Sequence, residues 1–299
     1  MIRRWNVYLK EMYPLLPRLI VGLLLFFEMY FLVILTNQHF KFQIGISEFV
    51  GAFTVFGFLL FLRIADDFKD FKTDSRLFPE RALPSGRVKK LDLAVLLTID
   101  LVLMLTLNLL FMNNLYFFLL LMGYGALMSV WFFSRAKIQP NLPLALVTHN
   151  PIQLIINIYV ISYTCIKYGI PMISYANFLI LFSLYFDGLV WEIGRKIRAP
   201  EDETDYVTYS KLFGVRKPML FIAAIMFVDL ITSTLMLTQL FSWAIAGTLL
   251  MYSLFLWRCC VFIRNPKSFP LKGLIEKYLY VTEAFVVFVL VVYLLLKIF

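Results

Sequence analysis

The sequence predicts an all-α, polytopic membrane protein with about nine transmembrane helices. First, the 299 residues are 61% hydrophobic, whereas a soluble domain is about 45–50% apolar. Second, the chain contains nine apolar runs of the length that crosses a bilayer, which is about 20 residues. Third, the basic residues gather in alternate loops, as they do around membrane spans.

The predicted spans are separated by loops of very different length. They cover about 15–36, 45–63, 92–112, 116–134, 143–165, 172–191, 219–238, 241–262 and 278–298. Two long hydrophilic loops, about 64–91 and 191–217, each follow a pair of spans. This arrangement indicates a weak internal duplication, so we expect one transmembrane domain over 1–299 with pseudo-repeated halves of about 1–134 and 135–299.

The basic residues also set the expected orientation. If the N-terminus is cytoplasmic, all of the 28 lysines and arginines except Lys41, Lys167 and Lys297 lie on the cytoplasmic side. Both long loops are then cytoplasmic, and the C-terminus at Phe299 is outside. The net charge of +9 is explained by contact with anionic lipid, and the absence of a nucleic-acid-binding motif argues against a nucleic-acid partner. The three cysteines have no CxxC spacing, which argues against a zinc site.

The first long loop begins with a dense group of carboxylates. Asp67, Asp70 and Asp74 are spaced i, i+3 and i+7, which places them on one face of a helix. Like charges stacked in this way repel unless a cation neutralises them, and Mg²⁺ prefers carboxylate oxygens. The alternative is a solvated acidic helix end whose charge is balanced by Lys69 and Lys72.

A Pro- and Gly-containing turn with several arginines follows at once, and arginines recognise phosphate oxygens. The whole stretch from Arg63 to Gly86 resembles the first signature of the UbiA-type intramembrane prenyltransferase superfamily. The matching residues are Asp67, Asp70, Asp74, Arg81, Pro84, Ser85 and Gly86. Two positions depart from that signature, because Asp66 stands where the family usually has Asn and Ala82 where it has Pro. Asp66 stays a candidate metal ligand.

The second long loop carries a less regular motif. Asp187 and Glu192 would be costly on a lipid-facing helix, and Glu192 shares a helix face with Arg195 and Lys196. The segment 209–214 resembles the end of the superfamily's second motif, although the usual Asp-x-x-x-Asp is missing. Glu192 is the best substitute for the first acid, and Asp187 is second. The other acid is Asp202 or Asp205, unless 201–205 is simply a solvated loop.

Two further groups of residues are candidates. Lys137, after Trp131, resembles a phosphate-binding lysine of the superfamily, or else it is an ordinary cytoplasmic lysine. His149, Asn150, Gln153 and Asn157 lie on one stripe of the fifth span. This stripe is either a pocket for a second substrate, with a base that receives a proton, or a set of interhelical hydrogen bonds.

The resemblance implies a fold of nine helices around a central cavity and a Mg²⁺-dependent reaction. In it, a prenyl group passes from an allylic isoprenoid diphosphate, through an allyl cation, to an aromatic or other lipid-soluble acceptor. The catalytic candidates are Asp67, Asp70, Asp74 and Glu192. The metal candidates are Asp66, Asp67, Asp70, Asp74, Asp187 and Glu192. The substrate-binding candidates are Arg63, Lys72, Arg81, Lys137, Arg195, Lys196, His149 and Asn150. One alternative is a terpene cyclase that uses the same site without an acceptor, and another is a transporter or a non-catalytic lipid-binding protein.

Overall fold

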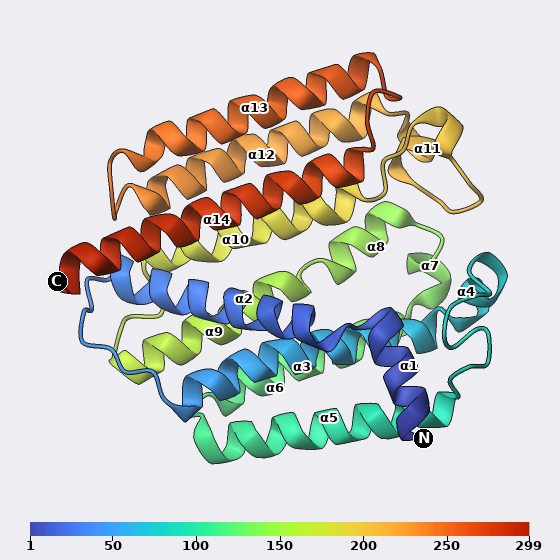
Figure 1. The fold of residues 1–299 in the computed structure, drawn as a ribbon, viewed down its shortest axis with the longest axis horizontal. Coiled ribbons are helices and arrows are strands. Elements are labelled where there is room, and N and C mark those ends of the chain that lie inside the picture. Colours follow the sequence, from blue (N-terminus) through green and yellow to red (C-terminus); the bar gives the residue numbers. More distant parts are fainter. Residues whose placement is uncertain (299) are drawn as a thin grey trace. The chain divides into compact units, whose positions relative to one another are not determined.

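The computed structural model describes residues 1–298, and these form helices and connecting segments without any strand (Figure 1). The helices are α1 (Ile2–Met12), α2 (Leu15–Thr36), α3 (Ile46–Lys69), α4 (Phe71–Leu77), α5 (Lys90–Phe111), α6 (Leu115–Ser129), η1 (Trp131–Phe133), α7 (Arg135–Ile138), α8 (Leu142–His149), α9 (Ile152–Tyr168), α10 (Tyr175–Gly194), η2 (Pro200–Asp202), α11 (Tyr209–Phe213), α12 (Arg216–Leu237), α13 (Ala244–Arg264) and α14 (Leu271–Ile298). The predicted all-α class is therefore confirmed.

Eight helical segments of the described chain are long and apolar enough to cross a membrane, with α8 and α9 taken together as one. The ninth expected span corresponds to α6, a shorter apolar helix of 15 residues. It ends earlier than the expected run 116–134, because the chain leaves the helix at Val130 and continues through Trp131–Phe133 with positive φ angles. The protein is thus a polytopic integral membrane protein. The cytoplasmic placement of the N-terminus stays a prediction, and Phe299 lies outside the described residues.

The fifth expected span, 143–165, is interrupted rather than continuous. Helix α8 ends at His149 and α9 begins at Ile152, with Asn150 and Pro151 between them. Proline has no N–H to donate and its ring clashes with the carbonyl of the preceding turn, so a helix breaks at this residue.

The chain divides into two compact units. The first contains Met1–Tyr30, Gln43–Gln139 and Ile158–Lys167, and the second contains Phe31–Phe42, Pro140–Asn157 and the chain from Tyr168 onward. The single domain with halves at about 1–134 and 135–299, and its central cavity, stay predictions.

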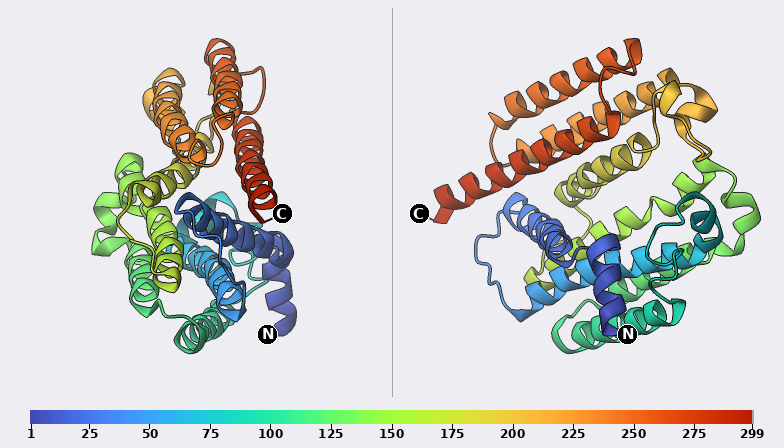
Figure 2. Two further views of the ribbon diagram at one scale, coloured as in Figure 1. Left: turned by 90° about the vertical axis from the view of Figure 1, so that its left-hand side faces the viewer. Right: turned by 45° about the vertical axis from the view of Figure 1, so that its right-hand side comes forward.

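The first unit is built around α3, which packs against α5 and α6. Buried polar side chains bond to one another here: Asn108 donates to Thr54 at 2.8 Å, and the Tyr159 hydroxyl donates to Asn108 at 2.8 Å. Because hydrocarbon offers no hydrogen-bond partner, such pairs satisfy groups that would otherwise destabilise the fold. Short helix α1 runs across α3 and α5 instead of along them (Figures 1 and 2).

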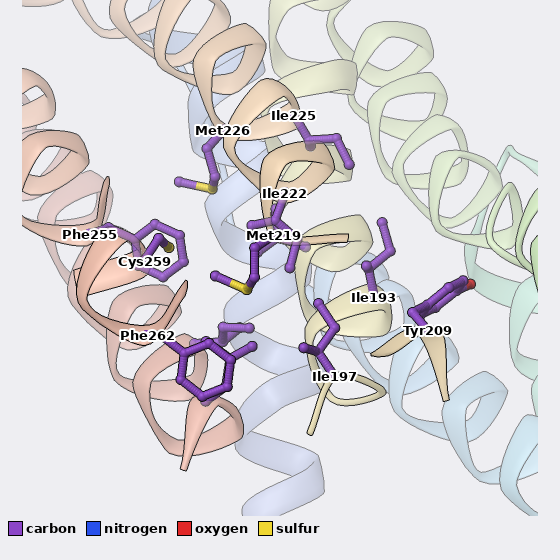
Figure 3. Packing of buried hydrophobic residues seen from close by; sticks show 13 residues of the cluster. Ile193, Ile197, Tyr209, Met219, Ile222, Ile225, Met226, Phe255, Cys259 and Phe262 are labelled. Atoms are coloured by element: carbon purple, nitrogen blue, oxygen red, sulfur yellow. The ribbon is translucent and has the colours of Figure 1, made fainter. Parts of the chain in front are cut away.

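In the second unit, α10, α12, α13 and α14 pack side by side (Figures 1 and 2). A cluster of buried apolar residues fills the space between them, and Figure 3 shows Met219 and Ile222 of α12 facing Phe255 and Phe262 of α13. The end of α10 lies so close to α14 that a Cβ on Gly194 would be 1.9 Å from the Cδ1 of Ile275. The packing therefore fixes the end of α10, where the second motif begins.

Close packing in the first unit leaves no space for a side chain at Gly51. A Cβ at this position of α3 would lie 2.2 Å from Cε2 of the fully buried Phe26. We expect Gly51→Ala to lower the stability by about 1–3 kcal/mol through overpacking, measured by thermal unfolding in detergent. The matched control is Gly123→Ala in α6, where a Cβ meets nothing within 4 Å. Equal unfolding midpoints for the two variants would contradict the prediction.

Candidate functional site

The carboxylates of the first motif lie at a break between two helices, not on one continuous helix. Helix α3 ends at Lys69 and α4 begins at Phe71, and Asp70 between them has non-helical angles of φ −101° and ψ 7°. The expected single helical face for Asp67, Asp70 and Asp74 is therefore wrong. Asp67 and Asp74 are buried, at 4% and 9% exposure, whereas Asp70 is only partly buried.

Asp67 is held from two sides. One oxygen forms an ion pair with Arg63, one helical turn earlier. The other accepts a hydrogen bond of 2.6 Å from the hydroxyl of Tyr8 in α1. A carboxylate with this little exposure requires such partners, because an unpaired buried charge is strongly destabilising.

Asp74 has an equivalent partner in the turn that follows it. Arg81 donates to Asp74 at 2.8 Å, and its guanidinium lies 3.9 Å from the ring centre of Phe78. The turn itself is anchored by Ala82 and Val88, which are buried in the same apolar cluster as Tyr8. Its reversal is made at Gly86, whose φ of +75° is favourable for glycine alone.

Asp66 pairs with Lys69 at 2.7 Å. The ammonium of Lys69 also lies 4.8 Å from the ring centre of Trp131, which adds a cation–π contact. Trp131 begins a run of three residues with positive φ, a conformation that destabilises a non-glycine backbone by about 1–2 kcal/mol per residue. The run leads into α7, where Lys137 is exposed; Lys72 on α4 is exposed as well.

Asp70 differs from its neighbours, because among residues 1–298 it forms no ion pair with a basic side chain. Burial raises the pKa of its carboxyl to about 6, and the charges of Asp66 and Asp74 add to this effect while Lys69 opposes it. Asp70 is thus the carboxylate of the motif that is most available to a new cationic partner.

The donor chemistry of this motif suits a hard divalent cation, since all candidates are carboxylates. Their arrangement does not, because within residues 1–298 no three His, Cys, Asp or Glu side chains lie close enough to hold a metal ion. The reason is that Asp66, Asp67 and Asp74 each face a cation of the chain itself. We therefore derive no catalytic step through a protein-bound metal.

The second unit carries the second motif at the end of α10. Glu192 pairs with Arg195 at 2.6 Å and with Lys196 at 2.8 Å, so two cations share one carboxylate. The Arg195 side chain is 41% exposed and the Lys196 side chain is 12% exposed. The group therefore has an excess of positive charge, part of which is accessible to an anion.

The loop after this helix is tied back by hydrogen bonds. The backbone N–H of Tyr209 donates to the carbonyl of Lys196 at 2.8 Å, and that of Arg198 donates to the Ser210 hydroxyl at 2.8 Å. Glu203 accepts from both Thr208 and Ser210. Glu203 was not a predicted site residue, because it lies in a loop outside the helices, where helical periodicity identifies no neighbours.

The remaining acids of the second motif have different surroundings. Asp202 and Asp205 are exposed, which agrees with a solvated loop. Asp187 has a buried oxygen without a hydrogen-bond partner among residues 1–298, and its charge interacts with Asp229 of α12 and Glu283 of α14. It therefore faces other acids of the bundle, whereas Glu192 faces bases, and a metal site shared by Asp187 and Glu192 stays a prediction.

The polar stripe of the fifth span lies at the break between α8 and α9. Asn150 donates to the Tyr185 hydroxyl at 3.3 Å, and Asn157 donates to the carbonyl of Leu181 at 3.1 Å. Both bonds reach α10, so these two side chains make interhelical hydrogen bonds, and the pocket for a second substrate stays a prediction. His149 contacts the Thr148 hydroxyl through Nδ1 at 3.0 Å.

The candidate residues thus form two groups, one in each unit. The first contains Arg63, Asp66, Asp67, Asp70, Lys72, Asp74, Arg81 and Lys137, and the second contains His149, Asn150, Asp187, Glu192, Arg195 and Lys196. The convergence of the two motifs on one ligand stays a prediction. Tyr8, which contacts Asp67, is one of 16 tyrosines in the chain, and no feature of the sequence distinguishes it from the others.

In sequence, the chain matches no family model and no curated protein. In structure, it is similar to a solved digeranylgeranylglyceryl phosphate synthase in membranes, with a TM-score of 0.58, 16% identity and coverage of 98% of both chains. The likeness extends over the whole chain and shows the fold. This fold agrees with the all-α, polytopic membrane architecture that the sequence predicted.

Asp70 provides a test of the site's electrostatics without any ligand. Its folded-state pKa of about 6 lies above the unfolded value of 3.8, so folding favours its protonated form. The contribution of this carboxyl to the free energy of unfolding is fully present below pH 3.8 and is lost as the pH rises through about 6. The loss is at most about 3 kcal/mol. In EDTA, we expect the thermal unfolding midpoint of Asp70→Asn to increase relative to that of the wild type as the pH rises from about 4 to 7. A pH-independent difference between the two proteins would contradict this assignment.

Proposed function

We propose that this protein transfers a prenyl group from an allylic isoprenoid diphosphate to a lipid-soluble acceptor within the membrane. The observation that carries the proposal is the group of four carboxylates at the end of α3 with its arginine partners. The fold, which is that of a solved prenyl-transferring synthase over the whole chain, supports it.

The basic residues are proposed to bind and stabilise the diphosphate. Arg63 and Arg81 lie beside the first motif, and Arg195 and Lys196 beside the second. Arginine matches the geometry of phosphate oxygens with several donors at once. These cations stabilise the charge that develops on the diphosphate as its C–O bond breaks and the bonding electrons leave with it.

The bond cleavage leaves an allyl cation, which must be kept from water. A helical bundle with an apolar interior provides this shielding. The acceptor then attacks the cation to form the new bond to carbon, and a proton leaves. His149 and Asn150, at the break before α9, are proposed to contact the acceptor, with His149 as the proton acceptor.

Mg²⁺ is proposed to arrive with the substrate, as the complex of its diphosphate. The carboxylates Asp66, Asp67, Asp70, Asp74, Asp187 and Glu192 are the candidates to meet it. Among the carboxylates of the first motif, Asp70 is the most available, because it forms no ion pair with a basic side chain among residues 1–298.

The acceptor class separates the proposal from its alternatives. We propose an aromatic acceptor, although the structural neighbour is named for a glyceryl phosphate product. Purified protein is to be incubated with allylic diphosphates of different length, with an aromatic acceptor, with a glyceryl phosphate lipid, and with none. A cyclic hydrocarbon or alcohol formed without acceptor would assign a terpene cyclase. Release of no diphosphate under any condition would favour a transporter or a lipid-binding protein.

Removal of one charge from Asp70 tests the site directly. We expect Asp70→Asn to lower the rate of diphosphate release about 100-fold or more, because the lost carboxylate would hold the divalent cation that offsets the charge of the leaving diphosphate. The matched control is Glu80→Gln, which removes an exposed carboxylate nearby. Near-wild-type turnover in folded Asp70→Asn would count against the proposal.

Metal removal is the complementary test. We expect excess EDTA to stop diphosphate release and MgCl₂ to restore it, because a divalent cation neutralises the leaving diphosphate. The thermal unfolding midpoint, measured in the same samples, reports whether the protein stays folded in EDTA. Undiminished turnover in EDTA would exclude the Mg²⁺ requirement.

A further inference from the structure

A single hydroxyl connects the N-terminal helix α1 to the first motif. Tyr8 is fully buried, and its oxygen lies 2.6 Å from Oδ2 of Asp67. Burial, together with the charge of Asp67, raises the pKa of the Tyr8 hydroxyl, so the group stays protonated and donates. The other oxygen of Asp67 is paired with Arg63. Both oxygens of this carboxylate are therefore occupied by different partners.

Helix α1 has enough other contacts to keep its position without this hydroxyl. Arg4 forms two hydrogen bonds with the Asp92 carboxylate, at 2.5 and 2.7 Å. The indole of Trp5 donates to the Asp92 carbonyl at 2.7 Å. Glu11, at the far end of α1, pairs with Arg87 at 2.6 Å. The hydroxyl of Tyr8 is thus not needed to hold α1 in place, and its hydrogen bond acts on the Asp67 carboxylate instead.

The consequence of this hydrogen bond appears at Arg63. An arginine and a carboxylate usually form two parallel hydrogen bonds when both oxygens are free. Here Tyr8 donates to Oδ2, whereas Arg63 donates to Oδ1 through Nη2 and also lies beside the Tyr8 hydroxyl. The Nε of Arg63 is buried and has no hydrogen-bond partner among residues 1–298. A buried donor without a partner destabilises a fold, so this N–H is available to an acceptor that a ligand would supply.

We infer that Tyr8 is a positioning residue, whose hydroxyl occupies Asp67 so that Arg63 keeps N–H donors for the diphosphate of the substrate. The inference rests on the proposed function, and it adds helix α1 to the diphosphate-binding machinery. It also gives Asp67 a specific role, which is to orient Arg63.

The test compares two tyrosines that each lose one buried hydroxyl. Tyr8→Phe removes the bond to Asp67, and the matched control Tyr13→Phe removes a 2.6 Å bond to the backbone carbonyl of Phe56. With inorganic pyrophosphate and MgCl₂, we expect the Kd of Tyr8→Phe to rise about tenfold, and that of Tyr13→Phe to equal the wild-type value. With an allylic diphosphate, KM should rise by the same factor while kcat changes less than twofold.

A double variant shows whether Tyr8 acts through Arg63. In an Arg63→Gln background, Tyr8→Phe should weaken pyrophosphate binding no further, because the donors that it positions are already absent. A full additional loss in that background, or equal pyrophosphate affinity of Tyr8→Phe and Tyr13→Phe, would overturn the inference. So would a Tyr8→Phe chain that does not fold, since the hydroxyl would then be structural.

Failure of the proposed function has a different signature. If the wild type binds pyrophosphate but releases none from allylic diphosphates, the proposal of prenyl transfer is wrong. The pyrophosphate affinities of the variants then decide the role of Tyr8. If the wild type turns over and Tyr8→Phe matches Tyr13→Phe in KM, only the inference on Tyr8 is wrong. A wild type that binds no pyrophosphate would overturn the inference.

Discussion

The pairing of buried carboxylates with arginines shapes the candidate site of the first unit. Asp67 and Asp74 are almost fully buried, and each is compensated by an arginine, Arg63 in the same helix and Arg81 in the following turn. In a bundle that faces lipid, an uncompensated charge of this kind would not be tolerated. The position of the turn 78–89 therefore follows from the burial of Asp74 as much as from its own apolar anchors.

The same constraint decides which groups stay available. Lys72 and Lys137 are exposed, and Asp70 has no basic side chain as an ion-pair partner among residues 1–298. In the second unit, Glu192 satisfies Arg195 and Lys196 together, which leaves that group with net positive charge. Side chains that are not paired within the fold can bind a ligand without breaking an internal contact.

The sequence predicts the helices well and the local geometry of the motifs poorly. An apolar run of about 20 residues allows hardly any structure in lipid except a helix, so the spans could be located, including those on either side of the motifs. The break at Asp70 could not be predicted, because no proline or glycine marks it. Tyr8 and Asp67 are 59 positions apart in the sequence, so no sequence periodicity indicates that they are in contact. The interruption of the fifth span was not predicted, although Pro151 lies at the break and its effect on the backbone is local.

The paired state of the first motif bears on how a diphosphate would bind under the proposed function. The arginines that match phosphate oxygens are the same ones that hold Asp67 and Asp74. An anion that draws Arg81 away would leave Asp74 uncompensated in a poorly solvated site. A divalent cation bound to the anion would supply the missing charge, so that Asp74 and Arg81 could exchange partners together. Binding of the anion and of the cation should therefore be thermodynamically coupled, each strengthening the other.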